Sequence, residues 1–132
     1  MKITGINHVT LLVNNKTESE KFFTEVLGLE KYDAGGRLWL KIGKQFLHIT
    51  NNSGDSKRGN FYHFAIEVEN VVDCVKAIAL KGISIFDLDS TQKKILVNSD
   101  YDMPMRQFFL EDPDGNLIEL IDTKNTFFVP VK

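Results

Sequence analysis

The chain has 132 residues, which is enough for one hydrophobic core and too short for two conventional domains. Its hydrophobic content of 42%, charged content of 26% and formal net charge of −2 are typical of a globular protein. Lysine and arginine are scattered rather than clustered, so nucleic acid is not an expected partner. A single cysteine, Cys74, excludes an intrachain disulfide. The sequence shows no apolar segment typical of a signal peptide or membrane span, so we expect a cytoplasmic protein that does not associate with membranes.

The first half of the chain predicts a strand, a helix and three further strands. The first strand covers Ile3–Val13, which is rich in β-branched residues and ends at an Asn-Asn pair. A helix capped by Thr17 or Ser19 follows, because large apolar residues recur at helical spacing before Gly28 stops it. Turns that contain glycine then separate three strands, at Glu30–Ala34, Arg37–Ile42 and Gln45–Thr50.

The second half repeats this order after a polar linker at residues 52–60. It predicts a strand at Phe61–Val68, a helix at Val71–Lys81 and a strand at Ile83–Leu88. A hairpin around an Asp-Pro-Asp-Gly-Asn turn closes it, with strands at Arg106–Glu111 and Leu117–Ile121. Residues 89–105 are predicted to form an irregular loop, although Lys94–Val97 has the composition of a strand.

The two halves also match in the spacing of particular residues. Each opens with a strand that bears a histidine, and a glycine ends its helix 20 positions after His8 or 19 positions after His63. Each closes with an apolar strand that has one polar residue at its centre, His48 or Glu119. We therefore predict one α+β domain of two βαβββ modules that form a cupped mixed sheet, with module one at residues 1–51, module two at 61–123 and a tail at 124–132.

Three segments carry a resemblance to a known family: Ile6–Val13, Phe22–Leu29 and, most specifically, Phe109–Leu120. Together they resemble the vicinal oxygen chelate superfamily, also called the glyoxalase/bleomycin resistance/dioxygenase family. The resemblance implies paired βαβββ modules around a cupped site. It also implies metal ligands on the first and last strand of each module, and the residues at those positions here are His8, His48, His63 and Glu119.

The chemistry of these four residues suits one divalent metal ion, whether zinc, nickel, manganese, cobalt or iron(II). All 3 histidines of the chain fall at ligand positions. Glu119 interrupts an apolar strand, where an unpaired charge would be costly. The alternative is that they are unrelated polar residues on half-exposed strands. Some members of the family, the bleomycin-binding proteins, bind drugs without a metal.

The role of His48 stays open between a fourth ligand and a residue beside the metal that moves protons or binds substrate. Glyoxalase I enzymes commonly place a glutamate there as the group that moves protons. The set of His8, His63 and Glu119 resembles the ligands of extradiol dioxygenases and fosfomycin-resistance enzymes. His48 and Glu119 are therefore the candidate catalytic residues.

The resemblance implies a metal-dependent, glyoxalase-like lyase or isomerase that acts on a small oxygen-bearing molecule able to chelate the metal. The alternatives are a ring-cleaving dioxygenase, a fosfomycin-type resistance enzyme and a non-catalytic drug- or metabolite-binding protein. Candidate substrate-binding residues are Trp39, Tyr101 and Arg106. Arg106 is included because fosfomycin-resistance enzymes place a phosphonate-contacting basic residue in a similar segment. The resemblance and the apolar segment Thr126–Val131 also predict a homodimer.

Overall fold

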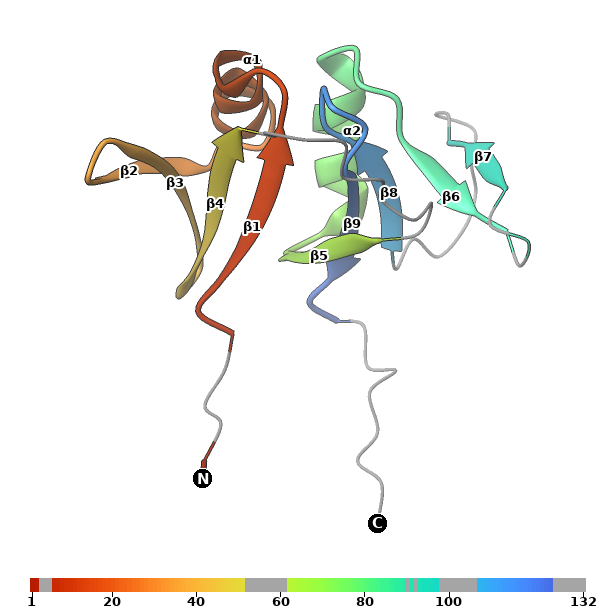
Figure 1. The fold of residues 1–132 in the computed structure, drawn as a ribbon. Coiled ribbons are helices and arrows are strands. Elements are labelled where there is room, and N and C mark those ends of the chain that lie inside the picture. The colour runs from red at the N-terminus through yellow and green to blue at the C-terminus, as the bar shows by residue number, and fades with distance from the viewer. Residues whose placement is uncertain (3–5, 52–61, 90, 92, 98–106, 125–132) are drawn as a thin grey trace. The chain divides into compact units, whose positions relative to one another are not determined.

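The computed structural model describes residues 1–2, 6–51, 62–89, 91, 93–97 and 107–124 (Figure 1). Contacts between Cα atoms divide the chain into two compact units. The first unit comprises Met1–Asn60 together with Asp112–Asn116, and the second comprises Phe61–Glu111 together with Leu117–Lys132. No helix within the described ranges is long and apolar enough to cross a membrane.

The first unit is a mixed sheet of four strands in the order β1-β4-β3-β2. The strand β1 runs parallel to β4, while β3 is antiparallel to both of its neighbours. The helical segment after β1 makes the crossover that a parallel pair needs. The elements are β1 His8–Val13, α1 Lys16–Lys21, the π-helical turn η1 Phe22–Val26, β2 Glu30–Ala34, β3 Arg37–Ile42 and β4 Gln45–Asn51.

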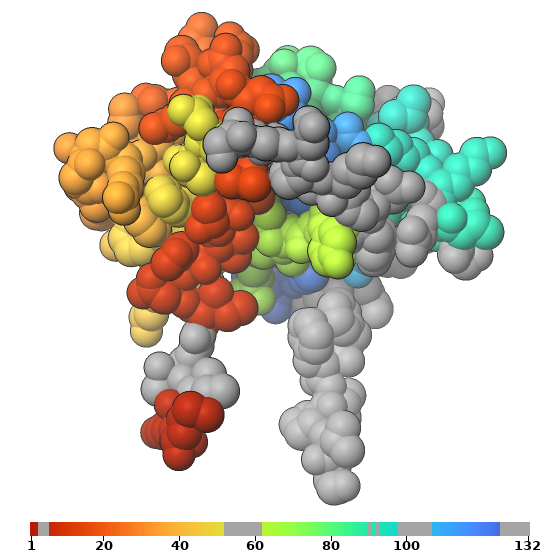
Figure 2. Space-filling model, viewed as in Figure 1, coloured from red at the N-terminus to blue at the C-terminus, as the bar shows by residue number. Residues whose placement is uncertain are grey.

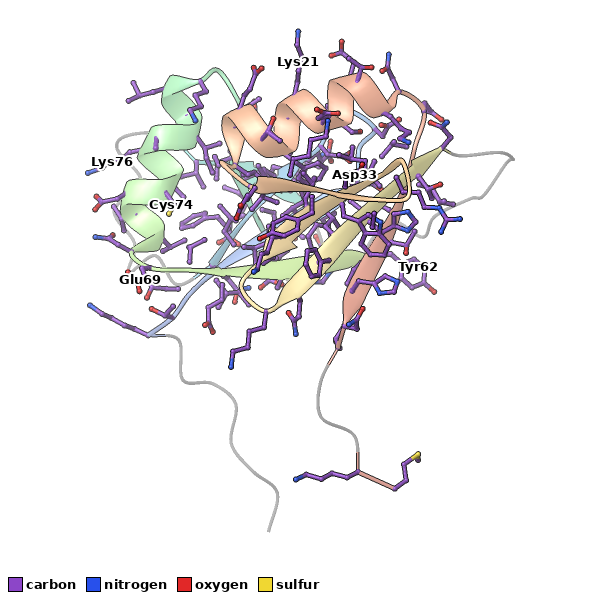
Figure 3. All side chains as sticks on the ribbon, turned by 90° about the vertical axis from the view of Figure 1, so that its left-hand side faces the viewer. Lys21, Asp33, Tyr62, Glu69, Cys74 and Lys76 are labelled. Atoms are coloured by element: carbon purple, nitrogen blue, oxygen red, sulfur yellow. The ribbon has the colours of Figure 1, made fainter. Side chains whose placement is uncertain are left out.

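The helix of the first unit begins two to four residues earlier than expected. Its cap is Asn15, whose side-chain oxygen accepts the backbone N–H of Glu18 at 3.1 Å, so the predicted caps Thr17 and Ser19 are wrong. The helix then widens into η1, where the Leu27 N–H donates to the Phe22 carbonyl at 3.3 Å. Lys21 projects from α1 away from the sheet, as Figure 3 shows.

Alternation along the strands gives the sheet of the first unit one buried face and one more open face. Leu38 and Leu40 on β3 and Leu47 and Ile49 on β4 are at most 5% exposed and form the buried face. Residues between them, such as His48, are half-buried and lie on the opposite face. This open face is the one that carries the polar and aromatic residues described below.

The second unit is a mixed sheet of five strands in the order β5-β9-β8-β6-β7, with β5 parallel to β9. Its helix is capped by Asn70, which has a φ of 55°, and by the Asp122 carboxylate, which accepts the Val71 N–H at 2.9 Å. The same bond to Val71, followed by one to Lys124, lowers the pKa of Asp122. The elements are β5 His63–Val68, α2 Val71–Leu80, β6 Phe86–Leu88, β7 Lys94–Leu96, β8 Gln107–Glu111 and β9 Leu117–Asp122.

The turn between β8 and β9 is held by Asp112, which is 5% exposed. Its carboxylate accepts the backbone N–H groups of Asp114 and Asn116 at 3.0 and 2.7 Å and the Asn116 side-chain amide at 2.6 Å. Burial nevertheless raises the pKa of Asp112. The neighbouring Asp114 carboxylate accepts the Asn14 N–H at 2.9 Å, which ties this turn to the end of β1.

The predicted α+β fold of two modules is confirmed, but several boundaries are wrong. Among the described residues, β1 begins at His8, so Ile6 and Asn7 are not part of it, β5 begins at His63, so Tyr62 is not part of it, and β6 begins at Phe86 rather than Ile83. The predicted strand residues 3–5, 61 and 106 lie outside the described residues. In each case, the strand begins only where a partner strand lies opposite. Residues 89–105 were predicted to be irregular, yet Lys94–Leu96 forms β7 by pairing with β6.

Candidate functional site

The first candidate pair, His8 and His48, is set by the register of β1 and β4. Thr10 lies opposite His48 and His8 lies opposite Phe46, so the two histidines are diagonal neighbours on one face. Their ring centroids are 6.4 Å apart, with the ring planes inclined at 76°. The parallel pairing of the first and last strands thus brings together two side chains 40 positions apart (48 − 8).

The second pair, His63 and Glu119, has the same register on β5 and β9. Ala65 lies opposite Glu119, and His63 lies opposite Leu117. The offset between the paired residues is therefore two positions in both units, as it is for His8 and His48. Here the side chains touch, with His63 Nε2 and Glu119 Oε2 2.9 Å apart. The repeat inferred from spacing extends to the pairing of individual residues.

An aromatic residue lies opposite the last-strand member of each pair. Trp39 on β3 lies opposite His48, and their rings stack with centroids 4.2 Å apart and planes within 8°. Phe109 on β8 lies opposite Glu119 and meets the His63 ring edge-on at 5.7 Å. The edge of Trp39 also meets His8, at 5.0 Å. Such contacts fix ring orientation and support the polar side chains from one side.

Burial distinguishes the two pairs electrostatically. Glu119 is 8% exposed, and a carboxylate that is this buried must share its charge with a hydrogen-bonding partner or a cation. In the first unit, the pKa of His48 is lowered, mainly by burial and then by the positive charges of Arg37, His8 and Lys16. A lowered pKa keeps the imidazole neutral near pH 7, and the neutral form is the one that binds a metal or accepts a proton.

These four residues fit a divalent metal in chemical type, since three imidazoles and one carboxylate match the preferences of zinc and the later transition metals. The structure brings the predicted ligands together as two pairs, one in each unit. Within the described ranges, no group of three or more His, Cys, Asp or Glu side chains is arranged to hold a metal ion. Of the two pairs, the one formed by His63 and Glu119 would be stabilised more by a cation, because Glu119 is a buried carboxylate.

Of the three predicted substrate-binding residues, Trp39 lies on the same face as the His8 and His48 pair. Tyr101 and Arg106 lie outside the described residues. Sequence reasoning missed Arg37 as a charged neighbour of His48. The signal was available, because Arg37 precedes Trp39 by two positions on a strand and therefore shares its face.

Residues 5–120 match the family model of the Glyoxalase/Bleomycin resistance protein/Dioxygenase superfamily. The chain belongs to this superfamily. No curated protein sequence matches the chain. Several solved structures share its fold, and those below 25% identity support the fold alone.

A protein of Bacillus anthracis assigned to the glyoxalase family is 25% identical, with a TM-score of 0.73 over 94% of this chain and 98% of the other. A variant of the fosfomycin resistance protein FosX of Listeria monocytogenes, in complex with Mn(II) and 1S,2S-dihydroxypropylphosphonic acid, is 18% identical, with a TM-score of 0.65 over 91% of this chain and 90% of the other. The antibiotic-binding protein TnmS3 of a Streptomyces species is 18% identical, with a TM-score of 0.67 over 92% and 98%. Solved proteins with this fold thus include a fosfomycin resistance protein and an antibiotic-binding protein.

Proposed function

We propose that this chain is a metal-dependent enzyme of the glyoxalase-like lyase or isomerase type that acts on a small oxygen-bearing molecule. The observation that carries the proposal is the repeated register of the His8 and His48 pair and the His63 and Glu119 pair. His8, His63 and Glu119 would hold one divalent cation, with His48 as fourth ligand or as its neighbour. A cation held there supplies Lewis-acid stabilisation to developing negative charge on substrate oxygens.

The roles of the protein side chains follow from their surroundings. His48 is neutral near pH 7, so a ring nitrogen of His48 can take a proton from the substrate and return it later. The stacked Trp39 ring keeps the His48 imidazole in a fixed orientation during this transfer. Glu119 contributes the negative charge that favours cation binding, and its contact with His63 orients that imidazole.

Manganese is the first ion to test, because the FosX variant of similar fold was solved with Mn(II). Zinc, nickel, cobalt and iron(II) suit the same donor atoms and form the comparison set. Calorimetry on chelator-treated protein should show one site per set of four ligands. If none of these five ions binds, the proposed metal-dependent function is lost.

Turnover assays then separate the chemistries. A hemithioacetal substrate tests the lyase and isomerase class, and an epoxide-bearing phosphonate tests the fosfomycin-type reaction. Anaerobic loading with iron(II), followed by air and a catechol, tests ring cleavage through the appearance of a yellow product. Turnover of the hemithioacetal supports the proposal as stated, and turnover of one of the others assigns the chain to that class instead.

We further propose that the protein is a cytoplasmic homodimer. Each unit carries only two of the four ligands, so a complete set can be drawn from one chain or from two. Light scattering at working concentration should give the mass of a dimer, and a monomer mass that persists after metal loading would remove this part of the proposal.

A non-catalytic binding protein is the second candidate function, and one observation favours it. The rings of Trp39, Phe46 and Tyr32 continue the aromatic surface beside His48, and such surfaces bind flat ligands without chemistry. Tight binding of an aromatic drug by metal-free protein, with no turnover after metal loading, would favour the binder over the enzyme.

A further inference from the structure

The open face of the first-unit sheet carries a continuous group of rings drawn from all four strands. His8 meets the edge of Trp39, which stacks on His48 at 4.2 Å. Phe46 meets Trp39 edge-on at 6.2 Å and Tyr32 at 5.4 Å. We call these five rings, His8, Tyr32, Trp39, Phe46 and His48, the aromatic face.

The aromatic face is not part of the hydrophobic core. The core residues of this sheet lie on the opposite face, where Leu40, Leu47 and Ile49 are at most 1% exposed. On the aromatic face Tyr32 is 36% exposed, and Trp39 and His48 are half-buried. Of these five rings, the proposed metal site would use only the two histidines with Trp39 beside them, so Tyr32 and Phe46 have no role in that site.

Cationic residues border the aromatic face on β3. Arg37 and Lys41 lie two positions before and after Trp39, so strand alternation places all three on one face. The Lys41 ammonium lies 5.3 Å from the centre of the Tyr32 ring, and Glu30 lies opposite Lys41 in the ladder. Arg37 lies opposite Ala34, and among the described residues no carboxylate is within 4.0 Å of its guanidinium. The exposed Arg37 therefore adds positive charge at one end of the ring group.

We propose that the aromatic face binds a planar anion of the aromatic carboxylate class, with its ring against the Trp39 and His48 pair and its carboxylate on Arg37. This inference rests on the proposed function, because it names the substrate class of the same site. Stacking recognises the flat ring, and the planar guanidinium grips a carboxylate through two parallel hydrogen bonds. Alternate residues on a strand are about 7 Å apart, a span that a ring and its carboxylate bridge.

Binding of 2-naphthoate to metal-free protein, in the presence of a chelator, tests the proposal. Trp39 is the only tryptophan, so its indole N–H gives a single NMR signal that reports directly on the aromatic face. The controls are 2-naphthalenemethanol, which lacks the charge, and cyclohexanecarboxylate, which lacks the flat ring. We expect 2-naphthoate to shift the indole signal and to bind at least about ten-fold more tightly than either control, the scale of one charge-assisted contact.

Variants of Arg37 assign the anion to that residue. Arg37→Ala should reduce the affinity for 2-naphthoate to that for 2-naphthalenemethanol. Arg37→Lys keeps the charge but loses the planar pair of N–H donors, so its affinity for 2-naphthoate should lie between those of the unchanged protein and Arg37→Ala. Lys21→Ala is the matched control, because it removes an exposed cation from α1, where the side chain points away from the sheet (Figure 3). The control should leave affinity unchanged.

The inference is overturned if the alcohol binds as tightly as the acid, if the Trp39 indole signal does not move, or if Arg37→Ala leaves affinity unchanged. A separate titration with Mn²⁺ keeps this result apart from the proposed function. Metal binding without 2-naphthoate binding removes the substrate class alone. Binding of 2-naphthoate by a protein that takes up no metal keeps the ligand class and removes the enzyme.

Discussion

The two units share a backbone register and differ in the surface that they build on it. In the first unit, the candidate ligands stand among half-exposed rings and cations, with His8 exposed on β1. Figure 2 shows red atoms of the N-terminal part of this unit at the surface. In the second unit, Phe86, Phe109 and Leu117 form a core cluster at most 9% exposed, against which Leu88 packs. The repeated strand pairing fixes where two polar side chains meet, and the neighbouring strands determine what those side chains do.

This difference predicts separate roles for the two units. Glu119, which is 8% exposed, lies 2.9 Å from the His63 ring, and its burial strengthens the attraction of its carboxylate for a cation. The rings and the exposed Arg37 of the first unit suit a molecule that arrives from solution. We therefore expect changes in the second unit to affect stability and metal affinity, and changes in the first unit to affect ligand selection.

The largest effect should come from the two aromatic residues that occupy matching positions. Phe109→Ala removes a ring that is 3% exposed and should lower the free energy of unfolding by about 3–5 kcal/mol. Trp39→Ala removes a half-buried ring and should cost about 1–2 kcal/mol. Urea denaturation of metal-free protein measures both. Equal losses of the free energy of unfolding in the two variants would contradict the expected difference between the two sheets.

Metal affinity should separate Glu119 from His48. Glu119→Gln keeps the shape and removes the only carboxylate of the set, so Mn²⁺ affinity should fall by more than about 100-fold, beyond the range for residues that merely support a ligand. His48→Gln should reduce affinity by about ten-fold or less if His48 stands beside the metal. Calorimetry gives both values, and circular dichroism checks that each variant is folded. The reverse order would make His48 the stronger ligand.

The pH dependence of stability should carry a contribution from His48. Its pKa in the folded protein lies below the ordinary value of 6.5, so the unfolded chain binds more protons between these two values. The free energy of unfolding should therefore rise with pH through this window and level off above 6.5. Thermal unfolding of metal-free protein between about pH 5 and 7.5 tests this, since that range brackets an ordinary histidine pKa. His48→Gln should flatten the rise, and an equally steep rise in that variant would assign it elsewhere.

The smallest effect concerns Ser19 in α1, which is fully buried and whose hydroxyl finds no hydrogen-bond partner within the described part of the chain. Ser19→Ala removes the cost of burying this hydroxyl and improves helix propensity, so the protein should gain about 0.5–1 kcal/mol. No such residue is found in α2, whose buried positions are all apolar. A loss of stability on urea denaturation would show that the hydroxyl has a partner in solution.

The sequence predicts strand limits well where turn residues flank the strand, and poorly where the strand depends on pairing with a distant partner strand. Glu30–Ala34 and Arg37–Ile42 were predicted with their observed limits, because glycine turns bound both strands. Strand β7 was assigned to a loop although Lys94–Val97 has the composition of a strand, because its pairing with β6 cannot be seen in the sequence. The pairing of His8 with His48 and of His63 with Glu119 was implied by the repeat and the family resemblance. Arg37 was overlooked because a charged residue at the start of a strand resembles an ordinary surface residue.

The π-helical turn η1 is a place where the number of residues between β1 and β2 can change by one. A π turn takes one more residue than an α turn, so the segment from Phe22 to Leu27 accommodates what amounts to an insertion. Deleting Thr24 would allow the α-helical hydrogen-bond pattern to continue to Gly28, with adjustment confined to this turn. Single-residue length changes should thus be tolerated here far better than inside β1 or β4, where a one-residue slip would turn His8 or His48 to the opposite face.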